Sequence, residues 1–398
     1  MLLYVALVLT ATSLGLHGAM MGLFALAMRR RARGASESHP AAAPRVSILK
    51  PLAGEDDDLA ENLESFARLA YPEFEILFGV ASKADPAFSL ASCFVARHPE
   101  LDARVVLTAP DAAVNPKVAQ LVGLESVATG EICVISDSNV RVSPAYLWSL
   151  VQGLGDATVG MVTSLFVGTG EKTLGAAIEN LQLCASSAPG LVAMNAVAAR
   201  PITVGKSMAM RRCDLARLGG FVRVGGVLAE DHALGRLVLD AGFSIMTSLD
   251  IVENRNLTGS LRRTIERHTR WSKTRRTLQP LGFFGEPLLM PIAISGLCFL
   301  LAPGPVMGVL FGISSVAQIG GAIYAVRVLR GRALRWWHAP LELVRTVVVL
   351  VCWAGGAFGG GRIEWRGHHF KVKRGSVIVP VEGRSIRARA QARERLAA

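Results

Sequence analysis

A buried strand is predicted by Ile132-Cys133-Val134-Ile135-Ser136, which is followed at once by the polar residues Asp137-Ser138-Asn139. The apolar run is short and rich in β-branched residues, and the residues after it are typical of turns. From residue 45 onward, strand-like and helix-like patterns alternate on both sides of this stretch. Such alternation predicts an α/β fold with an open, mostly parallel sheet that helices cover on both faces.

The neighbouring elements bring several polar residues to one edge of that sheet. Ligands of open α/β sheets bind outside the carboxyl ends of the strands, and both Asp137 and Asp85 follow a predicted strand directly. The other expected strands are 45–49, 74–80 and 103–107, and the expected helices are 59–69, 88–95 and 117–127.

Composition indicates a soluble domain combined with membrane segments. Of the 398 residues, 51% are apolar and 19% are charged, and the mean hydropathy is +0.39. These values exclude an ordinary cytosolic enzyme and a pure bundle of membrane spans. The formal net charge of +12 fits nucleic acid, an anionic lipid surface or a phosphorylated substrate. Basic residues cluster beside the apolar segments and no nucleic-acid-binding signature is present, so no nucleic-acid partner is expected. The six cysteines are scattered singly, which predicts neither a metal cage nor disulfides and fits reduced cytosol.

The N-terminal segment is predicted to be a membrane anchor. Leu2 to Ala27 contains no acidic residue, Lys or Arg and is long enough to cross a bilayer core of roughly 30 Å. Arginines follow it directly, whereas a cleaved signal peptide, the alternative, would carry positive charge before the apolar stretch. We therefore expect an anchor at 1–28, a basic linker at 29–44 and a cytoplasmic domain at 45–285.

A second membrane region is predicted at 286–360. Apolar runs between Pro287 and Val326 are joined by Ala302-Pro303-Gly304-Pro305, which predicts a helical hairpin. The run Leu341 to Gly360 is interpreted as an interfacial or re-entrant helix, because a full crossing would place the basic tail 361–398 outside. A crossing remains the alternative. Within the tail, Arg362 to Phe370 predicts a small β-hairpin whose adjacent histidines are surface residues rather than metal ligands.

Two residues at the sheet edge are candidates for a phosphate site. Asp137 could hold a divalent cation that bridges two phosphates, since hard cations take oxygen ligands, or it could only shape a turn. Lys117, in Asn115-Pro116-Lys117, could place its ammonium against a phosphate at a helix start, or it could be a solvated lysine.

Two further carboxylates and a basic-aromatic stretch complete the candidate site. Asp85 could accept from a ribose hydroxyl or a base NH group, or form a turn. Asp231, in Glu230-Asp231-His232, could be a general base or could stabilise a helix start. The stretch Arg267-His268-Thr269-Arg270-Trp271 lies just before the second apolar region, where a polyanionic leaving group beside a membrane would be handled. Trp271 could instead be an interfacial anchor.

Taken in order, these pieces resemble the lipid-directed glycosyltransferases of the family 2 superfamily, and most closely the ceramide glucosyltransferase family. The resemblance covers roughly residues 45–285. The matching segments are Lys50-Pro51-Leu52, 62–66, Tyr71-Pro72, 84–87, Asn115-Pro116-Lys117, Asp137-Ser138 with Arg141-Val142, Glu230-Asp231, and Arg267 with Arg270-Trp271.

The resemblance implies a GT-A-like fold and a role for each matching residue. It makes Asp231 the catalytic base and Asp137 the ligand of a divalent cation, Mg²⁺ or Mn²⁺. The implied donor contacts are Pro51, Asp85, Lys117 and Asp137, and the implied acceptor and diphosphate contacts are Arg267, Arg270 and Trp271. Two segments depart from the family pattern: Asn139 replaces a second acidic residue, and 183–189 occupies the place of a histidine in the eukaryotic ceramide enzymes.

The expected function is transfer of a hexose, glucose by resemblance, from a UDP-sugar to the hydroxyl of a membrane lipid such as ceramide, with inversion. The expected location is the cytoplasmic face of a membrane, a bacterial inner membrane by resemblance. Two alternatives remain: transfer of N-acetylglucosamine to a hopanoid lipid, and a non-catalytic membrane protein that binds UDP-sugars.

Overall fold

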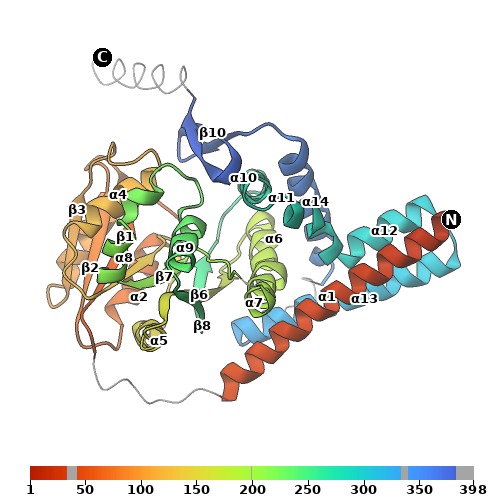
Figure 1. Ribbon diagram of the computed structural model, residues 1–398, viewed down its shortest axis with the longest axis horizontal. Coiled ribbons are helices and arrows are strands. Elements are labelled where there is room, and N and C mark those ends of the chain that lie inside the picture. Colours follow the sequence, from red (N-terminus) through yellow and green to blue (C-terminus); the bar gives the residue numbers. More distant parts are fainter. Residues whose placement is uncertain (34–42, 199, 333–338, 382–398) are drawn as a thin grey trace.

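The computed structural model describes residues 1–33, 43–198, 200–332 and 339–381. An α/β domain forms one side of the molecule, and a bundle of apolar helices extends from the other side (Figure 1). A small C-terminal sheet lies against the α/β domain. Parts of the predicted linker, 34–42, and of the predicted tail, 382–398, lie outside the described residues.

The α/β domain is built on an eight-stranded sheet with the order β3-β2-β1-β4-β7-β6-β8-β5. Its strands are β1 (Val46–Pro51), β2 (Phe74–Val80), β3 (Asp102–Leu107), β4 (Ile132–Ser136), β5 (Val140–Arg141), β6 (Val159–Thr169), β7 (Ser207–Arg211) and β8 (Ser244–Arg255). Pairs β1–β2, β1–β4, β2–β3 and β6–β8 are parallel. The other pairs are antiparallel. The predicted α/β class, with an open and mostly parallel sheet, is confirmed.

Helices cover both faces of this sheet. They are α2 (Leu59–Ala67), α3 (Pro86–Arg97), α4 (Pro116–Glu125), α5 (Tyr146–Gly153), α6 (Leu174–Gln182), α7 (Ala188–Val197), α8 (Arg212–Arg217) and α9 (Glu230–Asp240). One apolar cluster joins α2, α3, α5 and α7 to the sheet, and a second joins α4, α8 and α9 to it. Burial of apolar side chains in both clusters is the main stabilising contribution to the domain.

Two loops of the site begin helices in the same way. Asp85 accepts a hydrogen bond from the amide of Ala87 and caps α3, and Asn115 accepts from the amides of Lys117 and Val118 and caps α4. Each cap is followed by proline at the first helical position, where proline lacks only an amide that would have no partner in the helix. The local sequence therefore sets where both helices begin.

The long N-terminal helix α1 (Leu2–Arg33) packs against α12 (Pro291–Leu301) and α13 (Pro305–Arg330). Helices α12 and α13 pack against each other, as the predicted hairpin requires, but their lengths differ. At about 1.5 Å per residue, the 11 residues of α12 reach roughly 16 Å, about half of a bilayer core. The short helices before it, α11 (Pro280–Gly285) and the 3-10 turn to Leu289, meet α12 at 77°.

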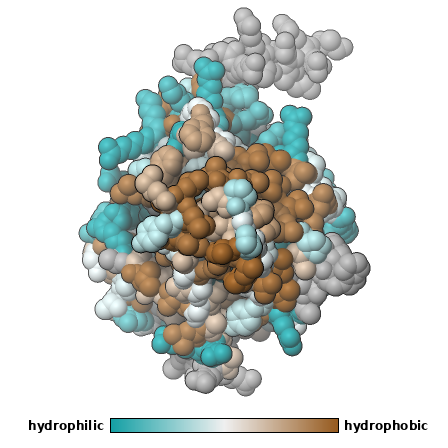
Figure 2. Space-filling model, turned by 90° about the vertical axis from the view of Figure 1, so that its right-hand side faces the viewer, coloured by the Kyte–Doolittle hydropathy of each residue, from teal (hydrophilic) through white to brown (hydrophobic). Residues whose placement is uncertain are grey.

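Among the described residues, three helices are long and apolar enough to cross a membrane: α1, α13 and α14 (Leu341–Phe358). Helix α1 continues to Arg33, so the first arginines of the predicted linker are helical. Figure 2 shows a broad hydrophobic surface on the side of the molecule from which the apolar helices extend. Exposed large side chains of the apolar helices include Leu297, Leu300, Val316, Val347 and Phe358.

Helix α14 lies along α10 (Leu261–Leu278), the helix that carries the basic-aromatic stretch. Contacts advance in the same direction on both helices, from Cys352 beside the Ile265 carbonyl to Arg276, which donates to the Ala357 carbonyl. Between these points, a Cβ at Gly356 would come within 2.5 Å of the Ser272 side chain. The glycine therefore allows the two backbones to approach closely.

The C-terminal sheet consists of β9 (Arg362–Trp365), β10 (His368–Val372) and β11 (Ile378–Pro380), all antiparallel. The predicted β-hairpin is thus confirmed and gains a third strand. Its core is made of Ile363, Phe370, Val372 and Ile378, which pack against Leu228. The Leu228 amide donates to the Ser376 carbonyl at 2.8 Å, so this sheet docks on the loop that precedes Glu230 and Asp231.

Candidate active site

The Asp137 carboxylate lies between two lysines at the end of β4. Lys117 Nζ is 2.7 Å from Asp137 Oδ1, and Lys206 Nζ is 3.2 Å from Oδ2. Lys206 also donates to the side chain of Asn139, at the same distance of 3.2 Å. Burial raises the pKa of Asp137, but the two ammonium groups outweigh it and hold this pKa well below its usual range. Asp137 is therefore an anion held in a fixed position.

Lys117 connects Asp137 to the predicted base region. Its Nζ is also 2.8 Å from Glu230 Oε1 at the first turn of α9. Burial lowers the pKa of Lys117, but Asp137 and Glu230 together raise it above its usual value. The interpretation of Lys117 as a solvated lysine is wrong, because its side chain is only 15% exposed and joins two carboxylates.

Asp231 follows Glu230 and is positioned by backbone amides. Its Oδ2 accepts from the Gly205 amide at 2.7 Å, and its Oδ1 accepts from the His232 amide. Burial raises the pKa values of both Asp231 and Glu230, and Lys117 opposes the shift in each. A partly exposed carboxylate with a raised pKa is suited to accept a proton.

A buried lysine to which the sequence analysis gave no role of its own supports this edge. Lys50 Nζ donates to the Asp137 carbonyl at 2.9 Å and to Ser136 Oγ at 3.2 Å, and it lies 4.0 Å from the centre of the Phe66 ring. Burial lowers its pKa to about 7, with Asp137 opposing. The sequence pattern does not predict that a lysine at the end of a strand is buried, so only the packing reveals this role.

The predicted donor contacts Pro51 and Asp85 lie at the neighbouring strand ends. Pro51 is buried at the end of β1. Asp85 Oδ1 accepts from the amides of Gly54 and Ala87, at 2.8 and 2.9 Å. Asp85 thus fixes the loop after β1 to the start of α3, which is the turn-forming role, and this pairing leaves Oδ2 available to a ligand.

Helix α10 places its three predicted residues in different environments. Arg267 forms an ion pair with Glu179 and donates to Asn256 Oδ1 at 3.2 Å. Arg270 lies over the Trp365 ring, 5.8 Å from its centre. Trp271 packs against the large apolar cluster and meets the ring of His268 edge to face. The three side chains therefore have different immediate partners, which are a carboxylate, an aromatic ring and the apolar core.

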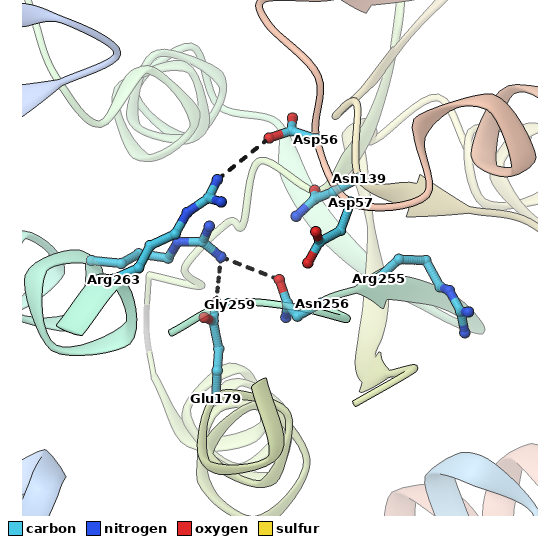
Figure 3. A pocket seen from close by; sticks show the side chains of 9 residues that line it. Asp56, Asp57, Asn139, Glu179, Arg255, Asn256, Gly259 and Arg263 are labelled. Carbon is cyan, nitrogen blue, oxygen red and sulfur yellow. Dashed lines mark hydrogen bonds and ion pairs between the residues drawn. The ribbon is translucent and has the colours of Figure 1, made fainter. Parts of the chain in front are cut away.

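A small pocket opens between the acidic loop before α2 and helix α10 (Figure 3). Asp56 and Asp57 approach it from one side, and Arg263 extends towards it from α10. Arg267, which is also on α10, lines the pocket as well. The remaining lining residues are Asn139, Glu179, Arg255, Asn256 and Gly259. Arg267 also interacts electrostatically with Lys206, which places this pocket beside the Asp137 cluster.

The residues at Asp137 fit a divalent cation only together with a phosphorylated ligand. No group of three or more His, Cys, Asp or Glu side chains in the described ranges could hold a metal ion. Mg²⁺ in enzymes is often bound through one or two carboxylates and substrate phosphates. Asp137, which is anionic and lies at the open edge of the sheet, supplies one such ligand.

Comparison with known proteins identifies the family. A family model described as "Glycosyl transferase family 21" matches residues 10–378. The chain belongs to glycosyl transferase family 21. This family 21 chain is 28% identical over 246 residues to ceramide glucosyltransferase 3 of Caenorhabditis elegans, covering 62% of this chain and 53% of the relative. It is 29% identical over 223 residues to a ceramide glucosyltransferase of Komagataella phaffii, covering 50% and 43%. The predicted resemblance is confirmed, and the chain spans about half the length of the curated relatives it matches.

Solved structures with similar folds are more distant. A mannosyltransferase from Pyrobaculum calidifontis, solved with GDP-mannose and Mn²⁺, superposes with a TM-score of 0.49 at 20% identity and covers 88% of this family 21 chain and 99% of its own. S. aureus TarS, solved with UDP-GlcNAc, gives a TM-score of 0.38 at 13% identity and covers 85% and 97%.

The structure places Lys117, Asp137 and Asp231 near one another, and the roles assigned to them stay predictions. Asp85 and Pro51 lie along the same sheet edge, and Arg270 interacts electrostatically with Glu230. Sequence reasoning missed Lys50, Lys206, Glu179, Trp365 and Arg366. Lys206 could have been suspected, because Gly205-Lys206 directly precedes a strand, but its pairing with Asp137 depends on an antiparallel neighbour of β4 that no local pattern shows.

Proposed function

We propose that this protein is a membrane-bound glycosyltransferase that moves a hexose from a UDP-sugar to the hydroxyl of a membrane lipid. The observation that carries the proposal is the arrangement of Asp231 beside the Lys117–Asp137 ion pair, with Arg270 of α10 close enough to Glu230 for their opposite charges to interact without an ion pair. Proton removal and stabilisation of a departing diphosphate are the two requirements of this reaction, and one sheet edge supplies groups for both.

In the proposed mechanism Asp231 accepts the proton of the acceptor hydroxyl as that oxygen attacks the anomeric carbon. A single displacement breaks the bond to the UDP oxygen and inverts the anomeric configuration. Lys117, Lys206 and Arg270 supply positive charge where negative charge develops on the diphosphate. A divalent cation held by Asp137, when bound, would add further charge neutralisation. Asp85 and Pro51 would contact the uridine, as the family resemblance implies.

Ceramide and glucose are the proposed acceptor and sugar, since the matched relatives are ceramide glucosyltransferases. The segment 183–189, where the resemblance expects a different residue, begins with a π-helix at Leu183–Ser187 between α6 and α7. Single-turn π-helices occur frequently at functional sites. Because this segment departs from the family pattern, a second candidate is transfer of N-acetylglucosamine to a hopanoid.

The position of α14 supports the interfacial interpretation over a crossing. Helix α10 carries eight charged residues among its 18, Arg262, Arg263, Glu266, Arg267, Arg270, Lys273, Arg275 and Arg276, and such a segment does not enter a bilayer core. Because α14 packs along α10, both helices lie at the same depth relative to the bilayer. The exposed stripe of α14 is apolar, with Val347, Val351 and Phe358. We propose that α14 lies on the membrane surface with this stripe in lipid.

The direct test uses the full chain in lipid nanodiscs that contain ceramide, a hopanoid alcohol or diacylglycerol. UDP-glucose, UDP-galactose or UDP-N-acetylglucosamine is supplied, and UDP release and glycolipid mass are measured together. We expect acceptor-dependent release and a product of inverted configuration by NMR. Binding of UDP-sugars without acceptor-dependent release in every combination would instead identify a non-catalytic binding protein.

A further inference from the structure

Arg366 lies at the tip of the β9–β10 hairpin in an unusual backbone conformation. Its φ is 47°, and that of Gly367 is 77°. Two central residues with positive φ are the geometry of a two-residue hairpin turn that favours Asn-Gly or Gly-Gly. Arginine in the left-handed region costs roughly 1 kcal/mol or more. The turn itself does not require an arginine, so the side chain is the feature to explain.

The side chain of Arg366 reaches from the C-terminal sheet to the loop after β1. It donates to the Ala53 carbonyl, and its Nη2 lies 2.8 Å from Asp56 Oδ2. A Cβ built on Gly54 would lie 3.9 Å from the guanidinium, and the Gly54 amide donates to Asp85. Arg366 thus lies at the end of the site where the donor nucleotide is proposed to bind.

The neighbouring residue, Trp365, brings Arg366 close to Arg270. Burial, together with repulsion from Arg267 and Arg366, lowers the pKa of Arg270 to about 10, although Glu230 and Glu179 oppose the shift. In the part of the chain that the structure describes, no carboxylate lies within ion-pair distance of Arg270. Three mutually repelling guanidinium groups, one of them without a carboxylate partner, form an arrangement that a polyanion would stabilise.

The sheet is held in place without Arg366. The amides of Leu228 and Ile378 make backbone hydrogen bonds across the interface, to Ser376 and Gly226, at 2.8 and 2.9 Å. The apolar core of the sheet also packs on Leu228. This docking surface adjoins the loop that leads to Asp231, so the sheet connects the base side of the site to the donor side.

We propose that Arg366 is a donor-binding residue contributed by the C-terminal sheet, which binds the diphosphate of the UDP-sugar together with Arg270. The proposal rests on the proposed function. In the ligand-free protein Asp56 pairs with the guanidinium, and donor phosphate oxygens replace this carboxylate when the donor binds. Trp365 orients Arg270 by stacking against it and is a positioning residue.

The test compares UDP and UMP binding to the full chain in nanodiscs, measured by calorimetry in the presence of Mn²⁺. Arg366→Ala should weaken UDP binding roughly tenfold to a hundredfold, the loss expected for a charge-assisted hydrogen bond, and should weaken UMP binding much less. Arg366→Lys should recover part of the UDP affinity, since it keeps the charge but loses the planar guanidinium. Arg374→Ala, at an exposed arginine in the 3-10 turn between β10 and β11, is the matched control and should bind both ligands as the wild type does.

A role limited to holding the loop after β1 predicts equal losses for UDP and UMP in Arg366→Ala, and this result would overturn the proposal. Unchanged UDP affinity would do the same. Failure of the proposed function is distinguishable, because it appears as absence of acceptor-dependent UDP release from the wild-type protein. Steady-state kinetics should show the Arg366→Ala effect mainly in the donor KM, whereas loss of the base acts on kcat.

Discussion

Lys117 and Glu230 form an ion pair of 2.8 Å that joins the start of α4 to the start of α9. The same ammonium holds Asp137 at 2.7 Å. One side chain therefore fixes the distance between the proposed cation ligand and the segment that carries the proposed base. This relationship explains why the site can be rigid although its parts come from residues more than 100 positions apart.

The first prediction concerns the proposed base. Asp231→Asn keeps the size of the side chain and can still accept from the Gly205 amide, but it cannot take up a proton. We expect kcat to fall by about 10²–10⁴, the usual contribution of general base catalysis, with UDP affinity nearly unchanged. Turnover is followed by UDP release and binding by calorimetry. Asp240→Asn, at the exposed end of the same helix, should keep full activity, and near-normal turnover of Asp231→Asn would show that another group is the base.

The second prediction concerns pH. Burial raises the pKa of Asp231, and the base must be unprotonated to act, so activity should fall as pH decreases through a value above the ordinary aspartate pKa of about 3.9. Lys117 lowers the pKa values of Asp231 and Glu230. Lys117→Met should therefore move the acidic limb of the kcat/KM profile to higher pH.

Lys117→Arg keeps the positive charge and is the control. The acidic limb of its kcat/KM profile should lie close to that of the wild type. Lys117→Met also leaves Asp137 and Glu230 without their shared cation, which should lower the free energy of unfolding by about 3–5 kcal/mol. Thermal unfolding is measured beside the pH profile so that only folded enzyme is compared. A limb that moves to lower pH would contradict the assigned role of Lys117.

The third prediction concerns Lys50, whose pKa of about 7 in the folded protein lies below the usual value of about 10.4. Between these two values the unfolded chain binds more protons, so stability should increase as pH rises from 7 towards 10. The slope has an upper limit of about 1.4 kcal/mol per pH unit. Below pH 7 both states are protonated and the slope from this group vanishes.

Lys50→Met removes the titrating group, and its free energy of unfolding should therefore rise less with pH across that range than that of the wild type. Its kcat should decrease, because the Asp137 carbonyl loses the ammonium that holds it at 2.9 Å. Lys172→Met, at an exposed lysine, should retain the wild-type slope. An unchanged slope in Lys50→Met would show that other groups govern this pH dependence.

Much of the fold could be predicted because its signals are local. The strand Ile132–Ser136 was predicted from its own residues, and the structure has it. The helix caps Asp85 and Asn115, which the structure adds, likewise depend only on neighbouring residues. Strand β7 lies between β4 and β6 and brings Lys206 to Asp137. That pairing is antiparallel and long-range, and hydrophobic periodicity does not contain it.

The residues of the candidate site also divide into those that local sequence signals indicate and those that only long-range contacts reveal. Lys117, Asp137 and Asp231 were recognisable because each follows a strand or begins a helix, where ligands of α/β sheets bind. Arg366 was not, because its partner Asp56 lies 310 residues away and its hairpin follows the apolar helices in the sequence. One of these segments precedes the C-terminal apolar helices in the sequence and the other follows them. Contacts between such segments depend on tertiary docking alone.

The last prediction concerns the level of α14 in the membrane. An interfacial helix has both ends on one side, whereas a crossing helix has its ends on opposite sides. Pro340→Cys and Gly360→Cys flank α14, and each is placed singly in a chain that retains Cys93 and Cys213. These two native cysteines are exposed in the α/β domain and serve as internal references for the side of the membrane on which that domain lies.

A membrane-impermeant maleimide is applied to sealed vesicles of each orientation, and labelled peptides are quantified by mass spectrometry. Because α14 packs along the charged helix α10, we expect both engineered cysteines to be labelled from the same side as Cys93. Labelling of Gly360→Cys from the opposite side would show that α14 crosses the bilayer. The charged helix α10, which packs along α14, would then lie at the depth of the lipid core, and this would contradict the expectation that its charges keep it outside.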